Sequence, residues 1–168
     1  EMLVLLAADG TVISAEEGYK PSSEMKMHLR CYSEREDVNA VVHAHPPIAT
    51  SYASMGKALD GYYMTENIMN LGAVPLASYA RPSTDEVPDS IAPLLQNHDA
   101  MLLANHGALT VGETLTKAYF NMESLEMYAK TSLYIHLLCG APDLSRQPID
   151  ELLNLRENVY KLPGRHPG

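Results

Sequence analysis

The chain has 168 residues with a formal net charge of -9, and 46 % of its residues are hydrophobic while 20 % are charged. This balance excludes a disordered chain, and the length fits one domain over residues 1–168. The excess of acidic residues argues against nucleic acid and anionic membranes as partners, because both require patches of Lys and Arg. We therefore expect a small-molecule ligand.

The two cysteines, Cys31 and Cys139, lie far apart and form no C-x-x-C motif. Neither a redox pair nor a thiolate metal site is expected, and we predict that both thiols are buried. The sequence has no secretory signal and no long apolar run, which predicts a cytoplasmic protein.

The first predicted element is a β-hairpin. Residues 2–7 and 11–14 are short apolar runs, and the Asp9-Gly10 pair between them favours a two-residue turn because both residues tolerate positive φ. A loop over residues 16–21 follows the hairpin.

A helix is predicted from this loop to about residue 34. Ser22 or Ser23 can cap its amino terminus, which places Glu24 in the first turn. The rest of the chain alternates strands and helices: the predicted strands span 39–45, 74–79, 100–105 and 108–111, and the predicted helices span 48–55, 83–97, 114–140 and 149–160. This order predicts an α/β (α+β layered) domain with a mainly antiparallel central sheet flanked by helices.

The tripeptide His43-Ala44-His45 ends the predicted strand just before Pro46-Pro47. Residues two apart on a strand point to the same face, so both imidazoles can reach one ion. Zinc sites of catalytic type use three protein ligands and keep one position open. The alternative is that both histidines are polar face residues of an edge strand.

His106 ends a second predicted strand and is followed by Gly107, which permits close approach of backbone or ligand. Strand-end histidines from two strands can converge, although His106 alone would also suit a β-bulge. His28, His98, His136 and His166 lack such a setting, and we expect them to be structural or surface residues, with His28 able to orient Glu24 one helical turn away.

Glu24 has two possible roles. At a helix start the macrodipole favours a carboxylate, which is a purely structural role. Beside a bound cation, the same carboxylate can ligate the metal or accept a proton. Ser22 and Ser23 can likewise either cap the helix or hold a phosphate through their hydroxyl and N–H groups.

These motifs occur together in a fixed order. The sequence contains P-S-S-E at residues 21–24, then His28, Tyr32 and Arg35, N-A-V-V-H-A-H at 39–45 and N-H-G at 105–107. The set resembles the class II aldolase/adducin family over residues 4–138, with bacterial L-fuculose-phosphate aldolases as the most similar members. The ordered set is far more specific than any one of its motifs.

The resemblance implies a function and a cofactor. In that family the glutamate and three histidines bind zinc, which assigns Zn2+ or another divalent metal to Glu24, His43, His45 and His106. The implied reaction is the reversible cleavage of a ketose 1-phosphate, similar to L-fuculose 1-phosphate, into dihydroxyacetone phosphate and an aldehyde. A metal-stabilised enediolate forms, and Glu24 moves the proton.

The resemblance also implies a cyclic homotetramer with active sites at the subunit interfaces. A family tyrosine that reaches the neighbouring site maps to Tyr63, whose alternative role is a core or surface aromatic, and residues 64–72 run longer than in the family. The family's amino-terminal phosphate-binding segment has no counterpart, so we expect the sequence to start after it, with Ser22 and Ser23 as the remaining phosphate contacts.

Three alternatives remain open. A pentulose-phosphate 4-epimerase shares the fold, but it resembles a version with aspartate at the position of Glu24. A sugar-phosphate dehydratase is the second alternative. A non-catalytic, adducin-like interaction domain is the third, and it is expected to have lost the metal histidines, which are present here.

Overall fold

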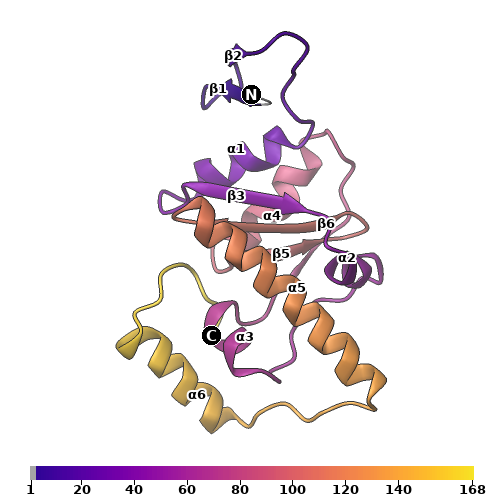
Figure 1. The fold of residues 1–168 in the computed structure, drawn as a ribbon, viewed down its shortest axis with the longest axis vertical. Coiled ribbons are helices and arrows are strands. Elements are labelled where there is room, and N and C mark those ends of the chain that lie inside the picture. The colour runs from indigo at the N-terminus through magenta and orange to yellow at the C-terminus, as the bar shows by residue number, and fades with distance from the viewer. Residues whose placement is uncertain (1–2) are drawn as a thin grey trace.

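The computed structural model describes residues 3–168, and a four-stranded sheet lies at its centre (Figure 1). The strands follow the order β3 (Ala40–Ala44), β6 (Gly107–Gly112), β5 (Ala100–Leu103) and β4 (Leu76–Ala77). β6 pairs antiparallel with β3 and with β5, whereas β4 pairs parallel with β5.

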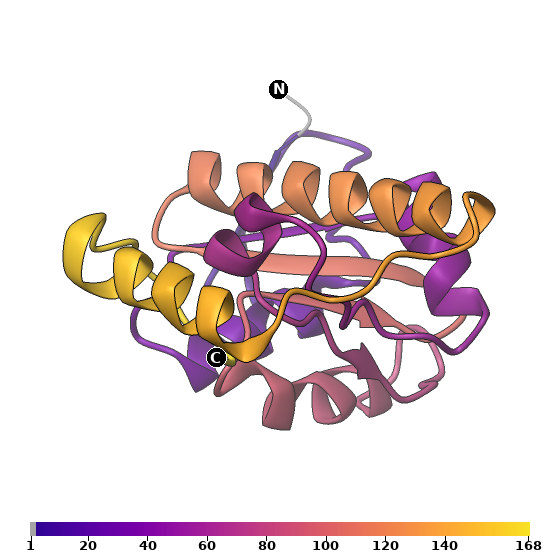
Figure 2. The same cartoon turned by 90° about the horizontal axis from the view of Figure 1, so that it is seen from below.

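Helices cover both faces of this sheet, which Figure 2 shows edge-on between α5 and α4. One face packs against α2 (Pro47–Ser54) and α5 (Leu115–Leu137), and the other against α1 (Met25–Glu34) and α4 (Glu86–Leu95). Strand residues alternate between the two cores, as Leu102 and Leu103 do on β5. The predicted mainly antiparallel sheet flanked by helices is confirmed.

The strand predicted over residues 74–79 is shorter in the structure. Val74 pairs only with Leu59 in an isolated bridge, with both of its N–H···O bonds at 3.0 Å or less. Pro75 follows and has no N–H to donate, so regular pairing begins at Leu76.

Two predicted turn and cap details are wrong. Leu6 pairs with Val12, so the hairpin turn spans residues 7–11 rather than two residues. The capping box predicted for α4 does not form, since Ser83 has a left-handed φ of 65°. The hydroxyl of Thr84 instead accepts from the N–H of Glu86 at 3.2 Å, and the carboxylate of Glu86 accepts from the N–H of Arg81 at 2.9 Å.

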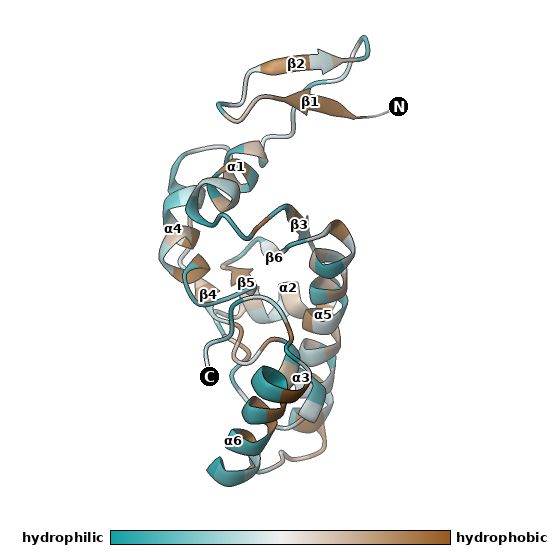
Figure 3. Ribbon diagram, turned by 90° about the vertical axis from the view of Figure 1, so that its left-hand side faces the viewer, coloured by the Kyte–Doolittle hydropathy of each residue, from teal (hydrophilic) through white to brown (hydrophobic). Residues whose placement is uncertain are grey.

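The hairpin of β1 (Val4–Leu6) and β2 (Val12–Ala15) stands apart from the sheet, beyond α1 (Figure 3). Residue 2 of the predicted first strand lies outside the described residues. Leu5 and Ile13 are exposed on this hairpin.

The carboxyl-terminal part of the chain returns to the sheet. It comprises α6 (Arg146–Asn154) and a short π-helix, η1 (Leu155–Val159), close to the predicted helix 149–160. α6 packs against α3 (Thr65–Asn70), which lies within residues 64–72. No helix among residues 3–168 is long and apolar enough to cross a membrane.

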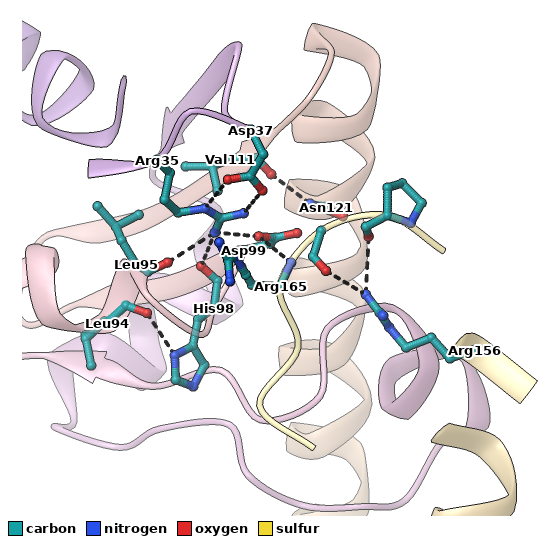
Figure 4. Close-up of polar contacts among 12 residues, drawn as sticks. Arg35, Asp37, Leu94, Leu95, His98, Asp99, Val111, Asn121, Arg156 and Arg165 are labelled. Carbon is teal, nitrogen blue, oxygen red and sulfur yellow. Dashed lines mark hydrogen bonds and ion pairs between the residues drawn. The ribbon is translucent and has the colours of Figure 1, made fainter. Parts of the chain in front are cut away.

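A buried ion-pair cluster at the start of β5 holds the chain segment around residues 163–165 (Figure 4). Arg35 and Asp99 are almost fully buried, and Nη1 of Arg35 lies 2.7 Å from Oδ1 of Asp99. The same carboxylate oxygen accepts from the N–H of Arg165 at 3.1 Å. Arg156, also buried, donates to the carbonyl of Pro163 at 3.2 Å.

The expectation that both cysteines are buried holds for Cys31 alone. Burial raises the pKa of the Cys31 thiol to about 12. Cys139 is exposed because α5 ends at Leu137, and Cys139 and Gly140 leave the helix with positive φ values of 70° and 89°.

Candidate metal centre

The structure brings His43, His45 and His106 together at one end of the sheet. Their potential ligand nitrogens all lie within 4.8 Å of one another. The ring centroids are 4.9 Å apart for His43 and His45, 4.8 Å for His43 and His106, and 5.1 Å for His45 and His106.

The register of β3 against β6 explains this convergence. His43 pairs with Leu109 and Ala44 with Ala108, so the chain just beyond β3 runs beside the start of β6. His106 sits in the tight turn between β5 and β6, where its N–H donates to the carbonyl of Leu103 at 3.0 Å. Asn105 opens the turn with a left-handed φ of 57°, a conformation that Asn tolerates better than most residues.

Gly107 is required for the close packing of these segments. A Cβ atom at this position would lie 2.5 Å from Cδ2 of His45 and 2.6 Å from the carbonyl oxygen of Ala44. The sequence predicted a close approach at Gly107, and the groups that approach are the backbone and ring of the H-x-H segment.

His43 has one satisfied and one unpartnered ring nitrogen. Its Nδ1 lies 2.9 Å from the carbonyl oxygen of Ala108, which can only accept, so Nδ1 carries the hydrogen and Nε2 carries a lone pair. Nε2 is buried and has no hydrogen-bond partner. Burial, followed by the neighbouring imidazoles of His106 and His45, lowers the pKa of His43 from its ordinary value, although the Ala108 carbonyl and Glu24 oppose this shift.

This donor set fits a divalent metal ion. A neutral imidazole with a free, buried lone pair and its other nitrogen bound to a backbone carbonyl is the usual arrangement of a metal-ligating histidine. Without an ion, the buried Nε2 would remain an unsatisfied polar atom, which is costly in a protein interior. Together, His43, His45 and His106 can hold the ion and leave an open position for a substrate.

Glu24 lies beside this group but outside it. It is the residue just before α1, not within its first turn as predicted, and its N–H donates to the hydroxyl of Ser22 at 3.2 Å. Its carboxylate does not belong to the set of atoms within 4.8 Å, yet its charge partly offsets the lowering of the pKa values of His43 and His28 that burial causes. A carboxylate at this distance can serve an ion or a substrate held by the histidines.

The two serines lie beside Glu24, and one of them borders a separate cavity. Ser22 and Ser23 are both exposed, and Ser22 lines a cavity of about 940 Å³ between the β1–β2 hairpin and α1. Ser23 donates to Oε1 of Glu24 at 3.4 Å. Both hydroxyls therefore lie next to Glu24, and neither contacts a histidine of the cluster among the described hydrogen bonds.

Tyr63 is on the other side of the sheet. It packs against the core between the sheet and α5, whereas His43 shares the opposite face with Val41. Burial, then the charges of Asp143 and Asp60, raises the pKa of the phenol. Within the described chain Tyr63 is not brought to the histidines.

Three of the other four histidines each contact a backbone carbonyl with a ring nitrogen. His98 contacts that of Leu94 at 3.0 Å, His136 that of Ser132 at 3.1 Å, and His166 that of Ile68 at 2.6 Å. Sequence reasoning overlooked Glu126, whose carboxylate accepts from the N–H groups of Ile48 and Ala49. The Pro46-Pro47 helix start indicates that a cap is needed, but no local pattern points to a residue so far along the chain.

The chain is similar to proteins of known family. Residues 1–133 match the model of the Class II Aldolase and Adducin N-terminal domain. The chain is 36 % identical over 157 residues to a 5-deoxy-D-ribulose 1-phosphate aldolase of Bacillus thuringiensis serovar kurstaki, an alignment that covers 92 % of this chain and 70 % of that protein. It is 37 % identical over 135 residues to a 3-oxo-tetronate 4-phosphate decarboxylase of Escherichia coli K12, covering 77 % of this chain but only 62 % of the relative.

Solved structures agree with these relatives. An L-fuculose 1-phosphate aldolase superimposes with a TM-score of 0.81 at 30 % identity, covering 90 % of this chain and 70 % of that one. The l-fuculose-1-phosphate aldolase of Thermus thermophilus gives a TM-score of 0.69 at 30 % identity, covering 84 % of this chain and 73 % of that one. The chain belongs to the class II aldolase and adducin family.

Proposed function

We propose that this chain is a zinc-dependent class II aldolase that reversibly cleaves a ketose 1-phosphate into dihydroxyacetone phosphate and an aldehyde. The observation that carries the proposal is the buried, unpartnered Nε2 of His43 within the group of three histidines. The substrate class follows the relatives, which include aldolases acting on 5-deoxy-D-ribulose 1-phosphate and L-fuculose phosphate.

In this proposal His43, His45 and His106 hold the ion. The bound cation supplies Lewis acidity, which offsets the negative charge that develops as the C3–C4 bond breaks. The Ala108 carbonyl fixes the tautomer and ring plane of His43, so that this ligand needs no reorganisation when the ion binds.

Glu24 is the proposed proton carrier. It would deliver the proton to carbon 3 as dihydroxyacetone phosphate forms, and it would take that proton away in the direction of synthesis. Its hydrogen bonds with both serines and its electrostatic effect on His43 support this role. Ser22 and Ser23 are the proposed phosphate contacts.

Tyr63 would act in a neighbouring subunit. Since it faces away from the histidines of its own chain, it can assist the aldehyde oxygen only in a second copy. The proposed assembly is a cyclic homotetramer with its sites between subunits.

A decarboxylase is the second candidate, and the 37 % identity to the 3-oxo-tetronate 4-phosphate decarboxylase favours it. Loss of carbon dioxide next to a carbonyl develops the same kind of charge as aldol cleavage. The aldolase relative aligns with 92 % of this chain and the decarboxylase with 77 %, which supports aldol cleavage as the first candidate.

One screen separates the two functions. Zinc-loaded protein is incubated with a panel of ketose 1-phosphates and, separately, with 3-oxo-tetronate 4-phosphate, while dihydroxyacetone phosphate and carbon dioxide are measured. The proposal requires dihydroxyacetone phosphate from at least one ketose, and no release by His43→Ala. Carbon dioxide from the 3-oxo acid, with no ketose cleaved, would instead establish the decarboxylase.

A further inference from the structure

Helix α2 links the two chain segments that carry the histidines. Its amino terminus follows His45 after only Pro46. At its other end, the carbonyl of Ala53 accepts from the N–H of Asn105 at 3.2 Å, and Asn105 directly precedes His106. The position of α2 therefore affects the positions of both His45 and His106.

The first turn of α2 has two N–H groups that the helix itself cannot satisfy. Pro47 has no N–H, and the N–H of Thr50 donates to the carbonyl of Pro46 at 2.9 Å. The N–H groups of Ile48 and Ala49 remain, and no side chain at the helix start caps them.

Glu126, on α5, satisfies both. Its Oε1 accepts from Ile48 at 3.0 Å, and its Oε2 accepts from Ala49 at 2.8 Å. Bonds to an ionised carboxylate are stronger than neutral ones, and the positive end of the helix dipole adds to them. Leu125 and Ala129 fix this part of α5 because both are buried in the core.

We infer that Glu126 is a positioning residue for the metal-binding histidines, holding α2 so that His45 and His106 stay within reach of one ion. The inference rests on the proposed metal site. It goes beyond capping, because the groups anchored at the two ends of α2 adjoin two ligands carried by different segments of the chain.

The geometry argues against a direct chemical role for Glu126. Both of its carboxylate oxygens already accept hydrogen bonds, and the carboxylate lies outside the histidine group. It borders a cavity of about 770 Å³ that Pro46 also lines. Water can reach the freed N–H groups from this cavity when the carboxylate is changed, so the fold should persist while α2 shifts.

The test compares Glu126→Gln with Glu123→Gln. Glu123 lies one turn earlier on α5 and lines the same cavity, but its carboxylate accepts from Tyr119 rather than from α2. The full chain is titrated with Zn2+ against a chromophoric chelator and with Co2+, whose absorption spectrum reports ligand geometry. Amide hydrogen exchange at Ile48 and Ala49 is followed in the same variants.

We expect Glu126→Gln to weaken metal binding by about 10-fold, the low end for residues that orient metal ligands, and to alter the Co2+ spectrum. Exchange at Ile48 and Ala49 should accelerate. Glu123→Gln should match the wild type in all three measurements. Glu126→Asp, which keeps the charge, should recover part of the affinity.

Two results would overturn the inference, and they are distinguishable. Wild-type affinity and spectrum in Glu126→Gln, with faster amide exchange, would reduce Glu126 to a helix cap while the metal site stands. A wild-type protein that binds neither Zn2+ nor Co2+ would remove the metal site itself and the proposed function with it.

Discussion

The two ends of strand β5 carry polar clusters of opposite character. Asp99 precedes the strand, and its Oδ1 lies 2.7 Å from Nη1 of Arg35 and accepts from the backbone N–H of Arg165 (Figure 4). His106 follows the strand and belongs to a cluster in which the buried Nε2 of His43 has no partner. The paired charges of the Arg35–Asp99 cluster stabilise the fold. In the histidine cluster, the lone pair of His43 Nε2 is left for a ligand.

The difference is also visible in what each cluster joins. The Arg35–Asp99 cluster ties the carboxyl-terminal tail to the sheet, since Arg165 and Gly164 both lie against Asp99. The histidine cluster joins the end of β3 to the turn before β6, and the charge of Glu24 acts on His43. The first cluster should therefore govern stability and the second should govern binding, and four experiments test this division.

Loss of His43 should have the largest effect. His43→Ala is expected to abolish tight metal binding and to lower turnover on the order of 10⁴-fold, because a Lewis acid contributes several kcal/mol and each 1.36 kcal/mol is about a factor of ten. Elemental analysis and steady-state kinetics measure both. His98→Ala is the control, and equal metal loss in both variants would contradict the site.

Breaking the ion pair between Arg35 and Asp99 should have the second-largest effect. Arg35→Met leaves the Asp99 carboxylate buried without its cation, and the expected cost is about 3–5 kcal/mol of unfolding free energy in urea. Arg81→Met, which breaks an exposed pair with Glu86, should cost at most about 1 kcal/mol. Folded Arg35→Met should bind metal normally, and a loss of metal affinity would show that the two ends of β5 are coupled.

Substitution of Glu24 distinguishes a role in proton transfer from a role at the helix start. Glu24→Gln, assayed at saturating zinc, should lower turnover by roughly 10²-fold or more if Glu24 carries the proton. Its stability should change by at most about 1 kcal/mol, the range for a charge at a helix start. Turnover equal to the wild type would assign the proton transfer to another group, with Tyr63 or Glu66 as the first residues to test.

The smallest predicted effect is the pH dependence of folding stability that His166 in the carboxyl-terminal tail contributes. Burial is the main cause that lowers the pKa of His166 below its ordinary 6.5, while its Nε2 contacts the carbonyl of Ile68. The unfolded chain then binds the proton more readily, so stability is complete above pH 6.5 and falls as the pH drops below it.

His166→Asn should reduce this slope by less than about 1.4 kcal/mol per pH unit, the limit for one proton. Urea unfolding between pH 5 and 8 measures it. His28 and His43 also have lowered pKa values, so the difference between wild type and variant isolates the contribution of His166. Identical slopes would show that folding does not lower the pKa of His166.

Local patterns in the sequence were enough for most of the fold and for the histidine group. His43 lies on β3 and His45 directly follows it, and a glycine after His106 marks the close approach between this segment and β6. These features depend on residues within a few positions of one another, which is the range over which periodicity and turn chemistry act.

Contacts between distant residues could not be derived in this way. Glu126 reaches Ile48 across 78 positions, and Arg35 meets Asp99 only because α1 and β5 belong to the same layered core. Tyr63 faces away from the histidines because it enters the opposite core, which no motif specifies. The sequence by itself determined which side chains could bind a metal and on which strand ends they lie. The tertiary structure decided which nitrogen is left free, which helix supports the ligands and which carboxylates are already engaged, because these depend on packing between segments far apart in the chain.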